Sequence, residues 1–359
     1  MSRVSRSTRA GFTLVELLLA VGLFSILLIA LMRLVDTSLT IWGRTDESRE
    51  LSEMGNAVVD MFSADVHALE AGKRGDLLAD WRRFDFDRDG IEGAPGQRLR
   101  LVRQVGADEL QRLSQGTAGK DVEVFERGLV EVGWALLPGT SDVPDERPLG
   151  TLVRGERLLG AADTLSFFDP NFFGPGGKPV PGSLFELTGG VLWFDVWFAS
   201  QTSVVHAGWK LGDGLADCAA SWDAWDRARP DPELSIFNRP AAGMPKAKDV
   251  PLLPRRVRVE LELERPRDLR FRTRLALAAN VEDTALVVRD ARRLPEPGAM
   301  ILLDDEWMRV VSVAEPRVMV ERARRTTRAT THAAETLVHH GWRVVREVPV
   351  DVTREDWDL

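Results

Sequence analysis

The sequence predicts an α+β fold, in which a long N-terminal transmembrane helix packs on an antiparallel β-rich head and an additional small β domain follows. Three patterns predict this fold. Residues 12–32 are almost entirely apolar, and apolar residues then recur at helical spacing up to about residue 71. Beyond it, short stretches in which apolar and polar residues alternate are typical of strands. The predicted parts are a leader (1–11), a helix (12–71, with 12–32 in the membrane), a head (72–274), a β-rich accessory domain (275–348) and a tail (349–359).

The apolar segment FTLVELLLAVGLFSILLIALM, residues 12–32, is long enough to cross a bilayer. A helix of this length extends about 31 Å, and the hydrocarbon core is about 30 Å thick. The leader contains Arg3, Arg6 and Arg9 and no acidic residue. Because basic flanks stay in the cytoplasm, we expect a single-pass protein whose leader stays in the cytoplasm while the rest of the chain crosses the membrane.

One acidic residue, Glu16, lies inside this apolar segment. A carboxylate in the bilayer core costs about 3 kcal/mol or more, so an incidental glutamate in a plain anchor is the less favoured explanation. Gly11 precedes the segment, and no A-x-A-like cleavage site follows it, which argues against an ordinary secretory signal.

The stretch GFTLVE, residues 11–16, resembles the processing site of type IV pilins and type II secretion pseudopilins. The resemblance implies that a prepilin peptidase cleaves between Gly11 and Phe12 and that Phe12, the new N-terminal residue, is methylated. It also implies that Glu16 serves assembly by pairing with the free N-terminal ammonium of a neighbouring subunit. Opposite charges attract strongly in a medium of low dielectric, so this pair would fix the register of one helix against the next.

The helix is expected to continue well beyond the membrane segment. Apolar residues recur at alternating spacings of three and four, at Leu51, Met54, Val58, Met61 or Phe62, Val66 and Leu69. Charged residues fill the gaps, and no proline occurs before Pro95. This pattern predicts one helix over about 12–71 whose second half is amphipathic and packs against the head.

The head is predicted to be an antiparallel sheet. Apolar and polar residues alternate in several short stretches, and glycines, prolines and aspartates, which favour turns, separate these stretches. The expected strands are Leu99–Val105, Val122–Phe125, Leu129–Leu137, Val191–Phe198 and Val257–Leu263. Two stretches with Pro and Gly, Asn171–Ser183 and Ala228–Asp249, are expected to be surface loops.

Most of residues 1–264 resembles J-type minor pseudopilins. The resemblance is carried by residues 19–51, by VLWFDVWF (191–198), by Trp222 and by LPRRVRVELEL (253–263). It implies a pilin-like head and assembly at the tip of a type II secretion pseudopilus, with other minor and major pseudopilins and with contacts to the secreted substrate, in support of protein export. W-type minor pilins of type IV pili share the N-terminal part and are the alternative.

Residues 275–345 resemble a small β module of phage tail and baseplate proteins. The first part of its motif is carried by Leu303, Asp304, Glu306, Met308 and Val310, and the second part by Arg322, Thr327, His332 and Val338. The resemblance implies a β-rich accessory domain with a binding or assembly surface, and an unrelated set of β hairpins is the alternative. A membrane-anchored binding module that uses this domain is a further functional hypothesis.

One acidic stretch, FDFDRDGIEG at 84–93, has the spacing of a metal site. Asp85, Asp87 and Asp89 are followed by glycine, as in the opening of a calcium loop. Gly96 stands where an EF-hand needs glutamate, so a shorter calcium loop closed by Glu92 is the candidate. A solvated acidic turn is the alternative explanation.

Other classes of function are disfavoured. The net charge of −8 argues against nucleic-acid binding through phosphate neutralisation. A single cysteine, Cys218, excludes an intrachain disulfide, and no HExxH, CxxC or GxSxG motif occurs. We therefore expect no enzyme and no required cofactor, with calcium as the one candidate ligand.

Overall fold

The computed structural model describes most of the chain. The described residues are 14–83, 95–113, 127–137, 149–161, 164–173, 179–199, 218–219, 221–225, 251–265, 272–325 and 327–351. The chain divides into two units, Met1–Glu50 and Leu51–Leu359, and each is described by itself.

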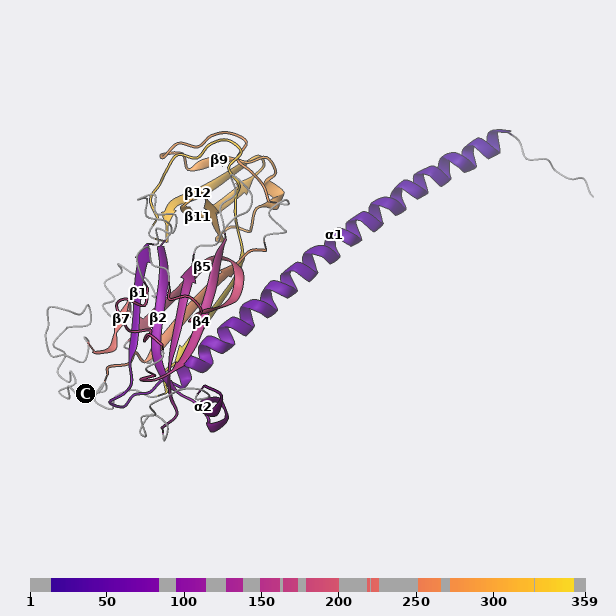
Figure 1. Cartoon of the computed structure of the whole chain (residues 1–359). Coiled ribbons are helices and arrows are strands. Elements are labelled where there is room, and N and C mark those ends of the chain that lie inside the picture. Colours follow the sequence, from indigo (N-terminus) through magenta and orange to yellow (C-terminus); the bar gives the residue numbers. More distant parts are fainter. Residues whose placement is uncertain are drawn as a thin grey trace, which may run out of the picture. The chain divides into compact units, whose positions relative to one another are not determined.

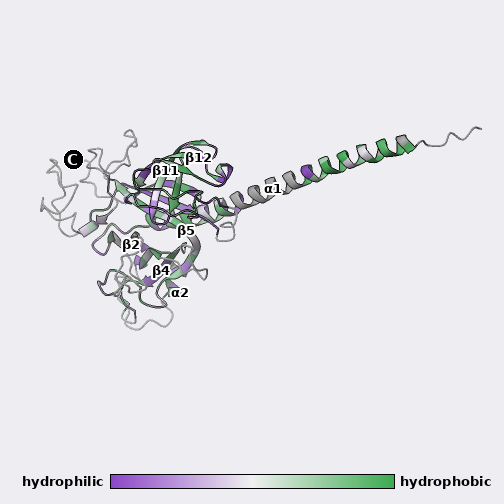
Figure 2. Cartoon of the chain, turned by 90° about the horizontal axis from the view of Figure 1, so that it is seen from above, coloured by the Kyte–Doolittle hydropathy of each residue, from purple (hydrophilic) through white to green (hydrophobic). Residues whose placement is uncertain are grey.

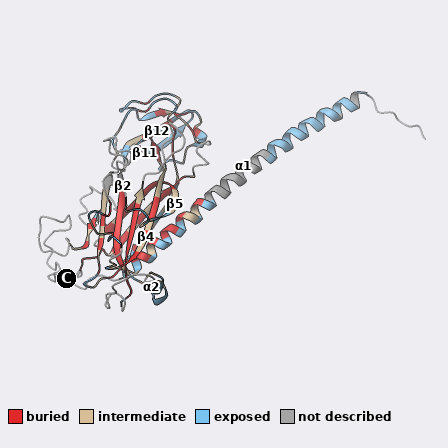
Figure 3. Ribbon diagram, in the orientation of Figure 1, coloured by how far each residue is buried: buried red, intermediate tan, exposed pale blue. Residues whose placement is uncertain are grey.

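The first unit contains most of the long helix α1 (Leu14–His67). Its stretch Leu17–Val35 is long and apolar enough to cross a membrane, and none of the residues whose burial is described there is buried. Figure 2 shows this part of α1 as largely hydrophobic, and Figure 3 shows it as exposed. The described helix thus fits the predicted single-pass anchor.

The second unit begins with the last turns of α1, which pack on a large sheet (Figure 1). Leu51, Val58, Phe62 and Val66 are buried in the common core, which confirms the predicted amphipathic face. The helix ends at His67 rather than near residue 71, because the chain turns there to pair with the sheet. Leu69 forms a bridge with Arg103, and the Glu70 N–H donates to the Val102 carbonyl.

The large sheet is antiparallel throughout its described pairs. Its strands follow the order β13-β8-β5-β4-β3-β2-β1-β7, with β6 paired to β5. They are β1 (Leu77–Arg83), β2 (Pro95–Gln104), β3 (Leu129–Leu137), β4 (Gly150–Leu158), β5 (Phe185–Ala199), β6 (Cys218–Ala219), β7 (Trp222–Asp223), β8 (Arg256–Leu263) and β13 (Trp342–Pro349). A short helix, α2 (Ala107–Leu113), follows β2. We call the helix turns from Leu51 onward and this sheet the head.

The predicted strands at 99–105, 129–137, 191–198 and 257–263 correspond to β2, β3, β5 and β8. The strand expected at Val122–Phe125 and the loop expected at Ala228–Asp249 lie outside the described residues. The loop prediction for Asn171–Ser183 is wrong in part. Phe172 and Phe173 are buried against each other and against Phe167, because aromatic side chains of this loop cover one side of β3 and β4.

A second, four-stranded sheet lies between β8 and β13 in the sequence. Its strands are β9 (Ala285–Val287), β10 (Met300–Leu303), β11 (Glu306–Ala314) and β12 (Arg317–Arg324), in the order β10-β11-β12-β9, with a short 3-10 helix at Ala291–Arg293. The buried apolar residues of this part of the chain form a core separate from that of the large sheet. We call residues 272–341 the inserted module, since the chain leaves the large sheet after β8 and returns to it as β13.

The predicted range of the accessory domain, 275–348, contains β13, whereas the structure pairs this strand with β8. The register runs without a break from Trp342 opposite Leu263 to Pro349 opposite Arg256. Val344 and Val348 pack toward the core that α1 covers, which gives this strand its place in the head. The sequence pattern alone carries no information about this long-range pairing.

Candidate functional site: the N-terminal segment and the buried polar clusters

The predicted processing residues, Gly11 and Phe12, lie outside the described residues. Glu16 lies within α1, close to the first described residue, but its side chain is not described. The structure shows that Glu16 and the packed turns of the head belong to the same helix. The helix that carries Glu16 runs unbroken for 54 residues and supplies the buried face of the head. The segment expected to assemble is therefore on the same helix as the turns that pack in the head.

The last turns of α1 carry a buried carboxylate, Asp65, that links the helix to three strands. Its side chain is only 2% exposed. Trp134 of β3 donates its indole N–H to Oδ2 at 2.8 Å. Arg154 of β4 donates from Nε and Nη2 at 2.9 and 2.7 Å, and Arg103 of β2 lies with its Nε 3.2 Å from Oδ1.

This cluster is extended by two further acids, Glu156 of β4 and Glu109 of α2, which pair with its arginines. Glu156 accepts from Arg103 at 2.7 Å and also pairs with Arg154. Burial alone would raise the pKa of Glu156, but Arg154 and Arg103 hold it below its ordinary value. Removing one partner of such a buried pair costs about 3–5 kcal/mol, because the other charge stays buried. The cluster therefore fixes the end of α1 in the head. Sequence reasoning missed it, although an aspartate between Phe62 and Val66, on the predicted apolar face, was a signal.

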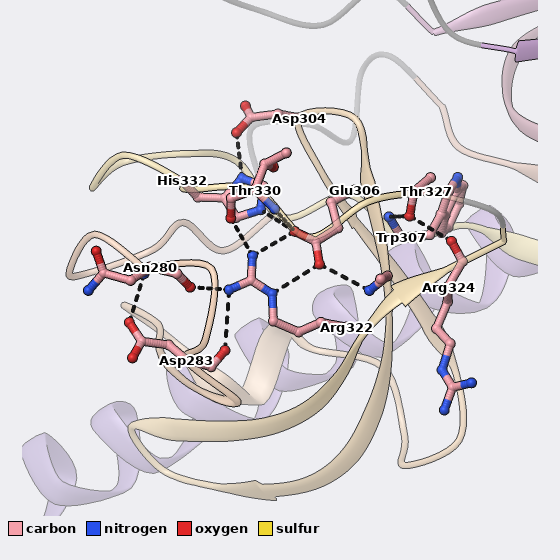
Figure 4. Close-up of polar contacts among 11 residues, drawn as sticks. Asn280, Asp283, Asp304, Glu306, Trp307, Arg322, Arg324, Thr327, Thr330 and His332 are labelled. Carbon is pink, nitrogen blue, oxygen red and sulfur yellow. Dashed lines mark hydrogen bonds and ion pairs between the residues drawn. The ribbon is translucent and has the colours of Figure 1, made fainter.

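The predicted motif of the inserted module forms one buried network around Glu306 (Figure 4). Arg322 donates to the carboxylate from Nε at 2.9 Å and Nη2 at 2.6 Å. The backbone N–H groups of Ala323 and Thr330 donate at 3.1 and 2.9 Å, and His332 Nε2 lies 3.0 Å away. Asp304 lies 2.6 Å from the other ring nitrogen of His332.

The electrostatics of this network follow from its hydrogen bonds. Burial would raise the pKa of Glu306, yet the donors, led by Arg322 and Thr330, lower it to about 2. Burial would lower the pKa of His332, but its carboxylate partners Asp304 and Glu306 raise it. Both ring nitrogens face carboxylates, so the doubly protonated imidazolium fits the site.

The other motif residues take structural positions as well. Leu303, Met308, Val310 and Val338 are buried in the module core, and the hydroxyl of Thr327 accepts from the Trp307 N–H at 3.1 Å. The resemblance thus identified residues that the fold brings together. Most of their side chains point inward and hold the module together, whereas Asp304 is exposed; a binding or assembly surface on the module stays a prediction.

The inserted module is joined to the head through Arg325, which follows β12. Its guanidinium lies between two indole rings, 4.8 Å from the centroid of Trp193 and 4.1 Å from that of Trp307. Its Nη2 lies 2.7 Å from Glu260 and 2.7 Å from Glu262, both on β8. Cation–π contacts are strongest when they are desolvated, and this side chain is only 10% exposed. We call these five residues the Arg325 joint.

The predicted calcium ligands Asp85, Asp87, Asp89 and Glu92 lie outside the described residues, so calcium binding stays a prediction. Within the described ranges, no group of three His, Cys, Asp or Glu residues is arranged to hold a metal ion.

Comparison with known proteins bears on the N-terminal segment. Residues 6–32 match the family described as the prokaryotic N-terminal methylation motif. No curated protein and no solved structure matches the chain. The matched range includes Gly11, Phe12 and Glu16, the residues on which the predicted processing and assembly depend. This motif implies processing by a prepilin peptidase and assembly with other pilin-like subunits. The chain therefore carries a prokaryotic N-terminal methylation motif of the prepilin type, at the start of a helix that continues into an α+β head.

Proposed function

We propose that this protein is a minor pseudopilin of a type II secretion system, of the J type, which assembles at the tip of the pseudopilus and supports protein export. The observation that carries the proposal is the matched N-terminal motif on a helix that continues into an α+β head. The J-type resemblance of residues 191–198 and 253–263, which form parts of β5 and β8, supports the finer assignment.

In this proposal the chain is a substrate of the prepilin peptidase and a structural subunit, not an enzyme. The arginine-bearing leader stays in the cytoplasm, the apolar half of α1 lies in the inner membrane, and the head lies in the periplasm. After cleavage, Glu16 would pair with the Phe12 ammonium of a neighbouring subunit. Each charge offsets the desolvation cost of the other, so the pair fixes one helix against the next.

The first experiment tests processing in cells that contain the prepilin peptidase. Gly11→Trp should leave the leader attached, because a bulky residue replaces the glycine at the predicted cut. The readout is the N-terminal residue and its methylation, measured by mass spectrometry. Val4→Trp, in the leader, is the control and should be processed normally. A Gly11→Trp chain that still begins at Phe12 would contradict the processing claim.

The second experiment separates a secretion subunit from a pilus subunit. Deletion of the chain should reduce export of secreted proteins and leave surface pili intact, and a chain with Glu16→Ala should fail to restore export. Loss of pili with normal export would favour the W-type minor pilin. Full rescue by Glu16→Ala would favour a membrane-anchored binding module, in which the helix is only a tether.

A further inference from the structure

The strand β13 forms one edge of the large sheet. Its inner side pairs with β8 over all eight residues without a bulge. No strand among the described residues pairs with its outer side. The opposite edge, β7, is only two residues long. The long regular edge of the described sheet is therefore β13.

The hydrogen bonds of the neighbouring strand show which backbone groups of β13 point outward. The N–H of Val350 donates to the Arg255 carbonyl at 3.0 Å, on the β8 side. Because backbone groups alternate along a strand, residues 348, 346, 344 and 342 also face β8, and Arg343 and Val345 face away. An edge of this kind is a template for another strand.

The side chains along this edge are suited to a neighbouring strand. Val345 is 41% exposed and Trp342 is 40% exposed, although both are large and apolar. On the face that Val345 occupies, Arg343 is half exposed and pairs with Glu260, and Glu347 pairs with Arg256, so both charges already have partners on β8. A partner strand would meet the exposed apolar side chain of Val345 between these two ion pairs.

Three contacts show how β13 runs relative to the last turns of α1. A Cβ on Gly55 would lie 2.8 Å from Val344 Cγ2, Asp60 pairs with Arg346, and the ring of His67 lies 3.0 Å from Asp351. The residue numbers rise together along both elements. Within the head, β13 therefore runs parallel to α1.

The order of the sheet determines how two heads can join. The path from β13 to β7 contains eight strands, and every neighbouring pair on it is antiparallel. The two edges therefore run in opposite directions. Two pilin-like heads of this topology can place their helices parallel and still pair edge to edge in the antiparallel sense. A twofold pair of β13 strands would instead place the helices of the two heads antiparallel.

We propose that the outer edge of β13 pairs with an edge strand of a neighbouring pilin-like subunit, so that the sheet continues from one head into the next. The inference rests on the proposed function, because a pilin-like neighbour with a parallel helix is what the N-terminal motif implies. The partner strand is antiparallel to β13 and presents an apolar residue opposite the exposed Val345.

The test uses the full chain in membranes of cells that assemble the system. A photo-crosslinking p-benzoylphenylalanine replaces Trp342, and the adduct is identified by mass spectrometry. The expected partner is a different protein that itself begins with a prepilin motif. In the same chain, Val345→Pro removes an outward N–H without removing a bond to β8, and it should lower the adduct yield about fivefold or more. Val345→Thr keeps the N–H and should leave the yield within about twofold.

A second crosslinker at Leu28, in the membrane helix, separates this inference from the proposed function. An adduct from Leu28 with pilin-like subunits, and none from Trp342, would overturn the edge pairing and leave the proposed function intact. An adduct from Trp342 with a second copy of the chain or with a secreted protein, or a yield that Val345→Pro does not change, would also overturn it. Absence of pilin-like adducts from both positions would overturn both proposals.

Discussion

Asp65 of α1 accepts a hydrogen bond of 2.8 Å from the indole of Trp134, deep in the core of the head. The same carboxylate binds Arg154, whose guanidinium also lies over the Trp134 ring, 5.6 Å from its centroid. A helix that has to carry a head into an assembly is thus attached by a buried ion pair as well as by apolar packing.

Asp65→Ala should lower the free energy of unfolding of the head by about 3–5 kcal/mol, because Arg154 and Arg103 would stay buried with one fewer counter-charge. The measurement is urea unfolding of the full chain in detergent, followed by tryptophan fluorescence. Asp60→Ala is the matched control, since Asp60 is exposed and pairs only with Arg346 in the described contacts. Its expected cost is about 0–1 kcal/mol, and equal losses for the two variants would contradict the assignment.

Gly55→Leu should destabilise the head by about 1–3 kcal/mol, because the added side chain would overlap Val344. Gly22→Leu, in the membrane part of α1, is the control, because a Cβ there meets no atom within 4 Å. The midpoint of thermal unfolding of the head measures both. A stabilised Gly55→Leu chain would mean that helix propensity outweighs packing at this position.

The stability of the inserted module should fall at acidic pH. The folded pKa of Glu306 is lowered to about 2 from an ordinary value of 4.5, so its contribution is present above that ordinary value and is lost as the pH falls through about 2. His332, whose pKa is raised, acts in the opposite sense and loses its contribution as the pH rises through its folded pKa. Urea unfolding between pH 2 and 5 should show a smaller slope for Glu306→Gln than for the parent chain. An unchanged slope would contradict this role.

Arg325→Ala should loosen the connection between the inserted module and the head. It leaves Glu260 and Glu262 with one fewer counter-charge and removes the cation between Trp193 and Trp307. The free energy of unfolding should fall by about 3–5 kcal/mol. Limited proteolysis should then cut faster in the chain that joins β8 to the module. Arg324→Ala is the control, because Arg324 is exposed and pairs with Glu321. Equal cleavage of the two variants would contradict the Arg325 joint.

Local patterns were sufficient to predict the elements that bury one face. The spacing of Leu51, Val58 and Phe62 predicted the packed face of α1, and the alternation in residues 257–263 predicted β8. Both predictions depend on the spacing of apolar residues along the chain, which can be read directly from the sequence.

Long-range relations could not be predicted in this way. The pairing of β13 with β8 spans the whole inserted module, and the contacts of Asp65 come from strands far along the chain. The resemblance did identify Glu306, Arg322 and His332, but only the geometry shows that they bind one another. The processing residues were predicted from a motif and depend on recognition by a peptidase, which the fold of the head does not determine.

The position of β13 after the inserted module has a consequence for synthesis of the chain. β13 leaves the ribosome after every other strand described in the head, so β8 has an open edge until residues 342–349 have been made. A premature stop codon before Trp342 would produce a chain with the complete anchor and module but with an unpaired, largely buried strand. Such a truncated product would be prone to aggregation, so residues 342–349 determine whether a newly made head can close its sheet.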